Sequence, residues 1–320
     1  MDTQIIFSNI GNPTLLFFLL GVIATLVKSD LSIPESSSKF ISLYLLFAIG
    51  FKGGQELQHS GLNAEIGITL LLSMFLALMV PLYTFFILKR RMSVQDAGAI
   101  AATYGSVSAV TFVSASAFLE AMKIPSGGHM VACMALMEAP AIIVGVWLMR
   151  RYSETENTQH GVKSIMHEAL TNGSVLMITG SLLIGLFSDA KQAEGIKPFT
   201  SDIFKGFLAI FLLEMGITAS KRFKAFKNYG WFVTLFALLV PVLNGTLASV
   251  LGSWAELEAG NRFLLSILAA SASYIAVPAA MKIANPQSDP GLYIPMALGV
   301  TFPLNITLGI PYYWWLCGRF

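Results

Sequence analysis

The chain has 320 residues, of which 55% are hydrophobic and only 12% are charged. A soluble domain carries about a quarter charged residues, so most of this chain must face lipid or other helices. The formal net charge is only +2, and the 20 Lys and Arg lie mainly between hydrophobic runs, which argues against a nucleic-acid partner.

Ten hydrophobic runs follow one another along the chain. Because a spanning helix needs about 20 mostly apolar residues, they predict an all-α polytopic membrane protein with ten transmembrane helices. The ten runs are 13–28, 38–57, 64–89, 96–121, 128–150, 168–187, 200–220, 229–252, 261–283 and 290–316. Gly, Ser and Pro interrupt the fourth, fifth, ninth and tenth runs.

The two halves of the chain share short segments in the same order. Residues 77–82 (Ala-Leu-Met-Val-Pro-Leu) match 237–242 (Ala-Leu-Leu-Val-Pro-Val), and Ser-Val-Ser at 106–108 matches Ser-Ala-Ser at 271–273. Two further matches pair 134–136 with 296–298 and 49–50 with 215–216. The offsets are 160, 165, 162 and 166 residues. An internal repeat in a polytopic membrane protein is typical of a secondary transporter.

A polar linker at 150–163 divides the ten runs into two sets of five, so the sequence predicts repeats at 1–155 and 156–320. If the N-terminus is outside, 13 of the 20 basic residues fall in cytoplasmic loops, including the run Lys89-Arg90-Arg91 and the cluster 221–224. Each half then has an odd number of spans, so the 5+5 repeat is inverted. Both termini are expected outside the cytoplasmic membrane.

The fourth and ninth runs contain the segments that favour a binding site. A helix broken at the bilayer midplane leaves unpaired backbone groups, which are tolerated only where they line a cavity. Half-helix N-termini suit a small anion, and freed carbonyls and hydroxyls suit Na⁺. Alternatively, these small residues only let helices pack closely, but two copies at equivalent places favour the site. The predicted anion site comprises Gly105, Ser106, Val107, Ser108, Ser271, Ala272, Ser273 and Tyr274.

A carboxylate, Glu138, lies in the fifth run, where a charge is costly and usually faces a cavity or a partner. We expect Glu138, Thr111 and Ser271 to hold Na⁺. In the alternative, Glu138 satisfies a backbone group opened by Pro140. No zincin or nucleophile-elbow motif occurs, so the sequence predicts no enzyme, no cofactor and no metal beyond Na⁺.

Lys52 and Glu214 are charges inside the second and seventh runs. When the halves are aligned on Gly50 and Gly216, both charges are displaced toward the outer face. We therefore expect them at similar depth, as an ion pair that is direct or bridged by water. In the alternative, Lys52 snorkels outward alone and Glu214 faces a polar crevice.

Several motifs in order carry a family resemblance over about residues 13–311. They are Asn12-Pro13-Thr14-Leu15, Ile33-Pro34-Glu35, Ile49-Gly50-Phe51-Lys52-Gly53-Gly54, Gly105-Ser106-Val107-Ser108, Ala269-Ala270-Ser271-Ala272-Ser273, 288–293 and 297–303. Together they resemble the cyanobacterial sodium-dependent bicarbonate transporter family. Three positions depart from its pattern: Tyr274 stands where the family has Asp, Ala109-Val110-Thr111 replaces Gly-Ser-Thr, and Glu138 replaces Asp.

The resemblance implies a transporting core of spans 3–5 and 8–10 that moves against a scaffold, or gate, of spans 1, 2, 6 and 7. It also implies a homotrimer and Na⁺-coupled uptake of bicarbonate or another small monovalent anion. The central linker is shorter than in the cyanobacterial members, so no regulatory partner is expected there. Two alternatives stay open: a cation/proton antiporter, for which Glu138 is a candidate although the expected Asp pair is absent, and a non-transporting membrane sensor or interaction protein.

Overall fold

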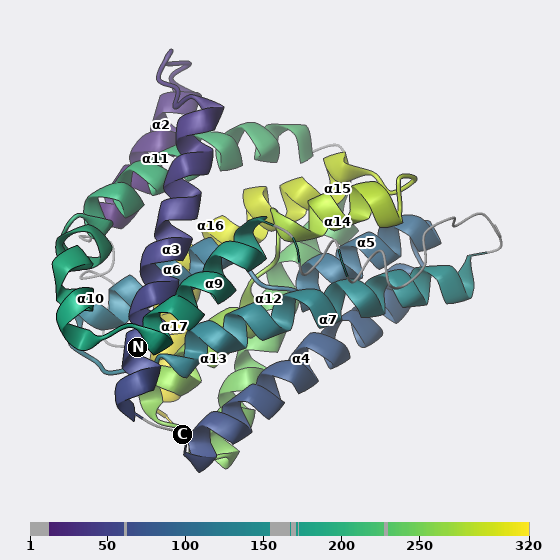
Figure 1. Cartoon of the computed structure of the whole chain (residues 1–320). Coiled ribbons are helices and arrows are strands. Elements are labelled where there is room, and N and C mark those ends of the chain that lie inside the picture. Colours follow the sequence, from purple (N-terminus) through teal and green to yellow (C-terminus); the bar gives the residue numbers. More distant parts are fainter. Residues whose placement is uncertain are drawn as a thin grey trace.

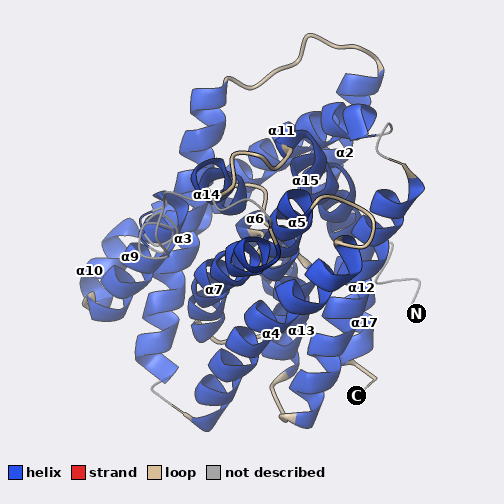
Figure 2. Cartoon of the chain, turned by 90° about the vertical axis from the view of Figure 1, so that its right-hand side faces the viewer, coloured by secondary structure: helices blue, strands red, loops and turns tan. Residues whose placement is uncertain are grey.

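The computed structural model describes residues 13–60, 63–153, 167, 171, 173–226 and 230–319, and all regular structure in these ranges is helical (Figure 2). Six helical stretches in them are long and apolar enough to cross a membrane. They are Ala64–Leu88, Val94–Ala121, His129–Tyr152, Lys191–Phe223, Trp231–Trp254 and Pro290–Cys317. The chain is therefore a polytopic, all-helical membrane protein. Most of the predicted linker at 150–163 lies outside the described residues.

One group of helices lies to one side, and we call its members the lateral helices. They are α2 (Pro13–Leu26), α3 (Glu35–Ser60), α9 (Gly173–Phe187) and α11 (Phe204–Phe226). α2 packs along α11, and α3 packs along α9; α2, α3 and α11 lie together at the left of Figure 1. Glycines permit this close packing, because a Cβ on Gly21 would collide with the Leu213 carbonyl and one on Gly185 with the Phe51 carbonyl.

A short connection joins α9 to α11 and contacts α3. It consists of α10 (Ala190–Lys197) and the π-helical turn η1 (Pro198–Asp202). Asp189 caps α10, because its side chain accepts hydrogen bonds from the backbone N–H groups of Lys191 and Gln192. The Tyr44 hydroxyl donates to the Phe199 carbonyl at 2.6 Å, which holds the connection against α3.

The remaining helices form what we call the central bundle. They are α4 (Ala64–Leu88), α5 (Val94–Gly105), α6 (Ala109–Ala121), α7 (His129–Tyr152), α12 (Trp231–Trp254), α13 (Ala259–Ala270), α14 (Ala276–Ala284), α15 (Pro290–Pro295), η3 (Met296–Thr301), α16 (Phe302–Leu304), η4 (Asn305–Gly309) and α17 (Ile310–Cys317). α4 packs against α5 and α7, and α12 packs against α13, η3 and α17. A buried hydrogen bond of 2.8 Å between Tyr104 and Thr301 joins α5 to η3.

The last predicted span, 290–316, is helical throughout but not a uniform α-helix. Two π-helical segments, η3 and η4, interrupt it. Pro295, Pro303 and Pro311 recur along this stretch. Since proline has no backbone N–H and crowds the preceding turn, it interrupts regular i to i−4 hydrogen bonding. The wide turns are the structural consequence of the proline spacing, and π-helical turns are frequent at functional sites.

Candidate functional site

The first interruption separates α5 from α6, as the sequence predicts. α5 ends at Gly105, Ser106 to Ser108 are not helical, and α6 begins at Ala109. The Ser108 hydroxyl accepts a hydrogen bond of 3.2 Å from the Thr111 N–H. A serine that caps the first free N–H groups in this way starts a helix, so Ser108 defines where the second half-helix begins.

The second interruption separates α13 from α14. α13 ends at Ala270, and α14 begins at Ala276. The Ser273 hydroxyl accepts a hydrogen bond of 3.4 Å from the Val277 N–H. Asn305 on η4 donates to the Ala270 carbonyl at 2.7 Å, so this side chain satisfies a backbone acceptor that the broken helix leaves free.

The two interruptions meet in the interior. The Ser108 N–H donates to the Ser271 hydroxyl at 2.9 Å, and the Ser273 N–H donates to the Thr103 carbonyl at 2.9 Å. Ser106, Ser108, Ser271 and Ser273 are all buried. Residues more than 160 positions apart therefore form one polar centre inside an apolar bundle.

A small cavity of about 20 Å³ lies beside this centre, between the central bundle and the lateral helices. Its lining comprises Leu46, Val107, Ser108, Ala109, Met134, Ala135, Glu138, Ser174, Ile178, Ser273, Tyr274 and Ile275. This volume holds about one water molecule. A planar anion of four heavy atoms does not fit, so the site is closed in this structure.

The cavity separates the predicted anion residues into two sets. Val107, Ser108, Ser273 and Tyr274 line it. The other four do not: Gly105, for example, packs against Pro81. The Ser106 hydroxyl is buried and has no hydrogen-bond partner within the described ranges.

The predicted Na⁺ residues are only partly brought together. Glu138 lines the cavity, whereas Thr111 and Ser271 do not. Both hydroxyls instead contact Ser108: Thr111 Oγ1 donates to Ser108 Oγ at 3.0 Å, and Ser271 Oγ accepts from the Ser108 N–H. No cluster of three or more His, Cys, Asp or Glu side chains that could hold a metal ion occurs in the described ranges. A cation here would depend on one carboxylate with hydroxyl and carbonyl oxygens.

A second, larger cavity of about 270 Å³ opens at one end of the molecule between α3, α6, α7 and η1. We call it the vestibule. Ile49, Phe112 and Met130 line the vestibule, whereas Leu46, Ser108 and Met134 on the same three helices line the small cavity. Three or four residues of helix span about 5–6 Å. A barrier about one helical turn thick therefore separates the two cavities.

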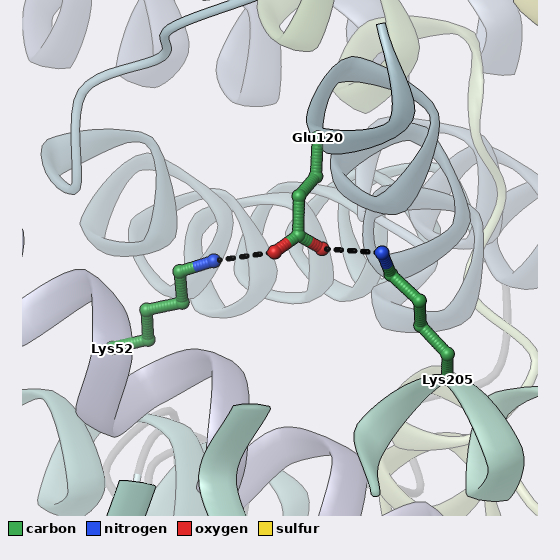
Figure 3. Close-up of polar contacts among 3 residues, drawn as sticks. All are labelled: Lys52, Glu120 and Lys205. Atoms are coloured by element: carbon green, nitrogen blue, oxygen red, sulfur yellow. Dashed lines mark hydrogen bonds and ion pairs between the residues drawn. The ribbon is translucent and has the colours of Figure 1, made fainter. Parts of the chain in front are cut away.

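The predicted ion pair between Lys52 and Glu214 is wrong. Lys52 Nζ lies 3.3 Å from Glu120 Oε1 on α6 (Figure 3). Glu214 accepts hydrogen bonds from the hydroxyls of Ser38 at 2.9 Å and Thr218 at 3.1 Å.

The reason is depth along α3. Ser38 and Lys52 are 14 residues apart on this helix, which corresponds to about 21 Å. Glu214 lies at the depth of Ser38. The prediction treated Gly50 and Gly216 as equally deep, but a sequence alignment of two glycines does not determine their depth in the structure.

Sequence reasoning missed two residues of the site region. Asn305 is an isolated amide in an apolar run, which was a signal that a backbone group there needed a partner. Glu120 ends the fourth run and gave no comparable signal, because a charge at a helix end is ordinary. Its importance depends on the lysines that the fold brings to it.

A family model described as the Na⁺-dependent bicarbonate transporter superfamily matches residues 13–318. A search among curated proteins gave no match. The family match covers both interruptions, both cavities and all the predicted site residues.

Proposed function

This chain belongs to the Na⁺-dependent bicarbonate transporter superfamily, and we propose that it is a secondary active transporter that couples Na⁺ entry to uptake of bicarbonate or another small monovalent anion. The observation that carries the proposal is the contact of the two helix interruptions, through Ser108 and Ser271, beside the Glu138 carboxylate. Transporters bind substrate and coupling ion where broken helices from two repeats meet.

Two matching hydrogen bonds support an inverted 5+5 repeat with halves 1–155 and 156–320. Asn261 Oδ1 accepts from the Gly127 N–H at 2.6 Å, and Asp96 Oδ1 accepts from the Asp289 N–H at 2.8 Å. Positions 96 and 261 differ by 165, and positions 127 and 289 by 162. These are offsets of the sequence repeat itself. Each bond ties the start of one broken helix to the loop after the other.

The lateral helices and the central bundle correspond to the scaffold and the core of this proposal. α3 pairs with α9, and α11 pairs with α2. In both pairs, the second span of one half packs against the first span of the other half. Both interruptions belong to the central bundle, and the small cavity lies at its boundary with α3 and α9. Movement of the bundle against the lateral helices would open this cavity to one side and then to the other.

The anion would bind at the starts of the two second half-helices, α6 and α14. Ser108 and Ser273 sit there and line the cavity, and the backbone N–H groups at a helix start carry partial positive charge. Tyr274 lines the same cavity, and its hydroxyl donates to Met215 Sδ on α11 at 3.8 Å. Its ring thus occupies the boundary that must open to admit an anion.

Na⁺ would bind at Glu138, whose carboxyl group is the acidic group of the cavity lining. A hard cation prefers oxygen ligands, and Ser108 and Ser273 offer hydroxyl oxygens there. Thr111 and Ser271 act through Ser108, because both contact it directly. In this assignment they position a ligand.

The distribution of charge supports an orientation with the vestibule outside and both termini external. Lys89, Arg90 and Arg91 follow α4, and Lys89 Nζ lies 3.8 Å from the centre of the Tyr152 ring at the end of α7. This basic end of the bundle is opposite the start of α7, which lies at the vestibule. Basic residues favour the cytoplasmic side. The trimer implied by the resemblance belongs to the proposal and is testable by the mass of the detergent-solubilised protein.

Uptake into proteoliposomes tests the function. The protein should accumulate radiolabelled bicarbonate when Na⁺ is outside, and should lose this uptake when K⁺ replaces Na⁺; empty liposomes are the control. Proton flux driven by Na⁺ without anion uptake would favour the antiporter. No flux of bicarbonate or other small anions by protein that reconstitutes correctly would contradict anion transport.

A further inference from the structure

Three charged side chains meet at the edge of the vestibule, where Lys52 and Glu120 belong to the lining and Lys205 does not. Glu120, at the end of α6, lies between Lys52 of α3 and Lys205 of α11 (Figure 3). Glu120 Oε1 is 3.3 Å from Lys52 Nζ, and Glu120 Oε2 is 3.8 Å from Lys205 Nζ. One carboxylate thus gives a separate oxygen to each of two ammonium groups, and those groups come from two different lateral helices.

This geometry describes the ligand that the lysines accept. A carboxylate is a planar O–C–O group with one negative charge, and bicarbonate and formate share that group. The vestibule, at about 270 Å³, has room for such an anion next to Lys52. Ser116, Ser126, Thr200 and Ser201 also line it and offer hydroxyl groups. The surroundings are therefore polar and large enough for an exchange.

The pairs are weak enough to exchange. The side chains of Lys52, Glu120 and Lys205 are 43%, 43% and 58% exposed. An exposed ion pair changes an equilibrium constant by no more than about fivefold. Glu56 also lines the vestibule, and its negative charge would oppose a second anion. If the incoming anion takes the place of Glu120 and does not add to it, the vestibule still holds two acidic groups, the anion and Glu56.

We propose that Lys52 and Lys205 form an outer binding site for a planar, singly charged oxyanion, and that Glu120 is the built-in occupant that the incoming anion displaces. The site deepens the proposed function and rests on its orientation of the vestibule. Glu120 and Ser108 are at opposite ends of α6, about 18 Å apart. Displacement of Glu120 at the entrance would also remove the two ion pairs that join α6 to α3 and α11.

The test measures lysine protection in the purified full-length protein. Lys52 and Lys205 are acylated with an amine-reactive ester, and mass spectrometry follows each site with increasing formate, which forms no carbamate with lysine, and then with bicarbonate. Glu120→Gln keeps the shape of the side chain but removes its charge. In this variant formate should protect both lysines at a concentration about threefold lower than in wild type. Glu120→Asp, with its shorter reach, should be intermediate.

The controls separate this site from general charge effects and from transport. Lys191, an exposed lysine on α10 that neither lines the vestibule nor pairs with Glu120, should show no protection, and Lys191→Met should transport as wild type does. Chloride at equal ionic strength should protect neither Lys52 nor Lys205. Equal protection by chloride, or no gain in Glu120→Gln, would overturn the site. Because labelling needs no flux, absence of bicarbonate uptake would contradict the proposed function alone.

Discussion

Replacement of Ser108 by Ala removes a hydroxyl that accepts two hydrogen bonds at the closed site. Ser108 Oγ accepts from the Thr111 N–H at 3.2 Å and from Thr111 Oγ1 at 3.0 Å, and it lines the small cavity with Glu138. Loss of an N-cap costs about 1 kcal/mol, which a protein of this size tolerates. A hydrogen bond to a charged ligand is worth about 1.5–3 kcal/mol. Anion half-saturation should therefore rise by about tenfold or more, while the fold persists.

The matched control is Ser114→Ala on the same helix. Ser114 is a buried serine whose hydroxyl donates to the Val110 carbonyl at 2.9 Å, and it does not line the small cavity. Its replacement should leave anion half-saturation near the wild-type value. The assay is initial uptake of radiolabelled bicarbonate at saturating Na⁺, with thermal stability measured on the same samples.

A bulky replacement gives the complementary result. The cavity of about 20 Å³ cannot take the larger side chain of Ser108→Leu, in which a carbon replaces the oxygen and two methyl groups are added, and overpacking costs about 1–3 kcal/mol. Uptake should fall below detection although the protein still inserts in the membrane, and Ser273→Leu should behave alike. If Ser108→Ala and Ser114→Ala had the same anion half-saturation, or if Ser108→Leu transported normally, the anion site would not lie at the interruptions.

Three further predictions follow from the packing and the cavity. Glu138→Gln should raise half-saturating Na⁺ by about tenfold or more with a smaller effect on the anion, and unchanged Na⁺ dependence in uptake assays would assign Glu138 a structural role. Gly185→Ala should destabilise the protein by about 1–3 kcal/mol, because its Cβ would collide with the lateral helix α3; Gly180→Ala on the same helix meets nothing within 4 Å and is the control, so equal melting temperatures for the two would contradict the packing argument. Asn305→Ala leaves the Ala270 carbonyl unpaired and should lower the free energy of unfolding by about 1–3 kcal/mol, whereas an unchanged value would show that another group satisfies this carbonyl.

The sequence predicted the interruptions because their chemistry is local. Gly105 ends one helix, and Ser108 can cap the next with its own hydroxyl, so these residue types are compatible with a break at this point. The repeat then located the second interruption at Ser271 to Ser273. The membrane class was predictable for a similar reason, since apolar length is a property of each run by itself.

The partners of the charges were not predictable, because they depend on rotation and depth. Lys52 and Glu214 were placed from an alignment of glycines, which gives a position along a helix but not the neighbour that its side chain faces. In the structure the partners are Glu120 for Lys52 and Ser38 for Glu214. Likewise, Thr111 and Ser271 are close in sequence to the cavity-lining residues Ser108 and Ser273. Their hydroxyls contact Ser108 and do not line the cavity.

The two cavities together indicate what must move. On α3, α6 and α7, the residue that lines the vestibule and the residue that lines the small cavity differ by one helical turn. At this level Ile49, Phe112 and Met130 face the vestibule, and an apolar barrier excludes hydrated ions. In the proposed transport, an anion from the vestibule would therefore reach Ser108 only when α6 and α7 shift against α3. Glu120 pairs α6 with α3 at the same entrance, so a shift of α6 against α3 that opens the barrier would also separate this ion pair.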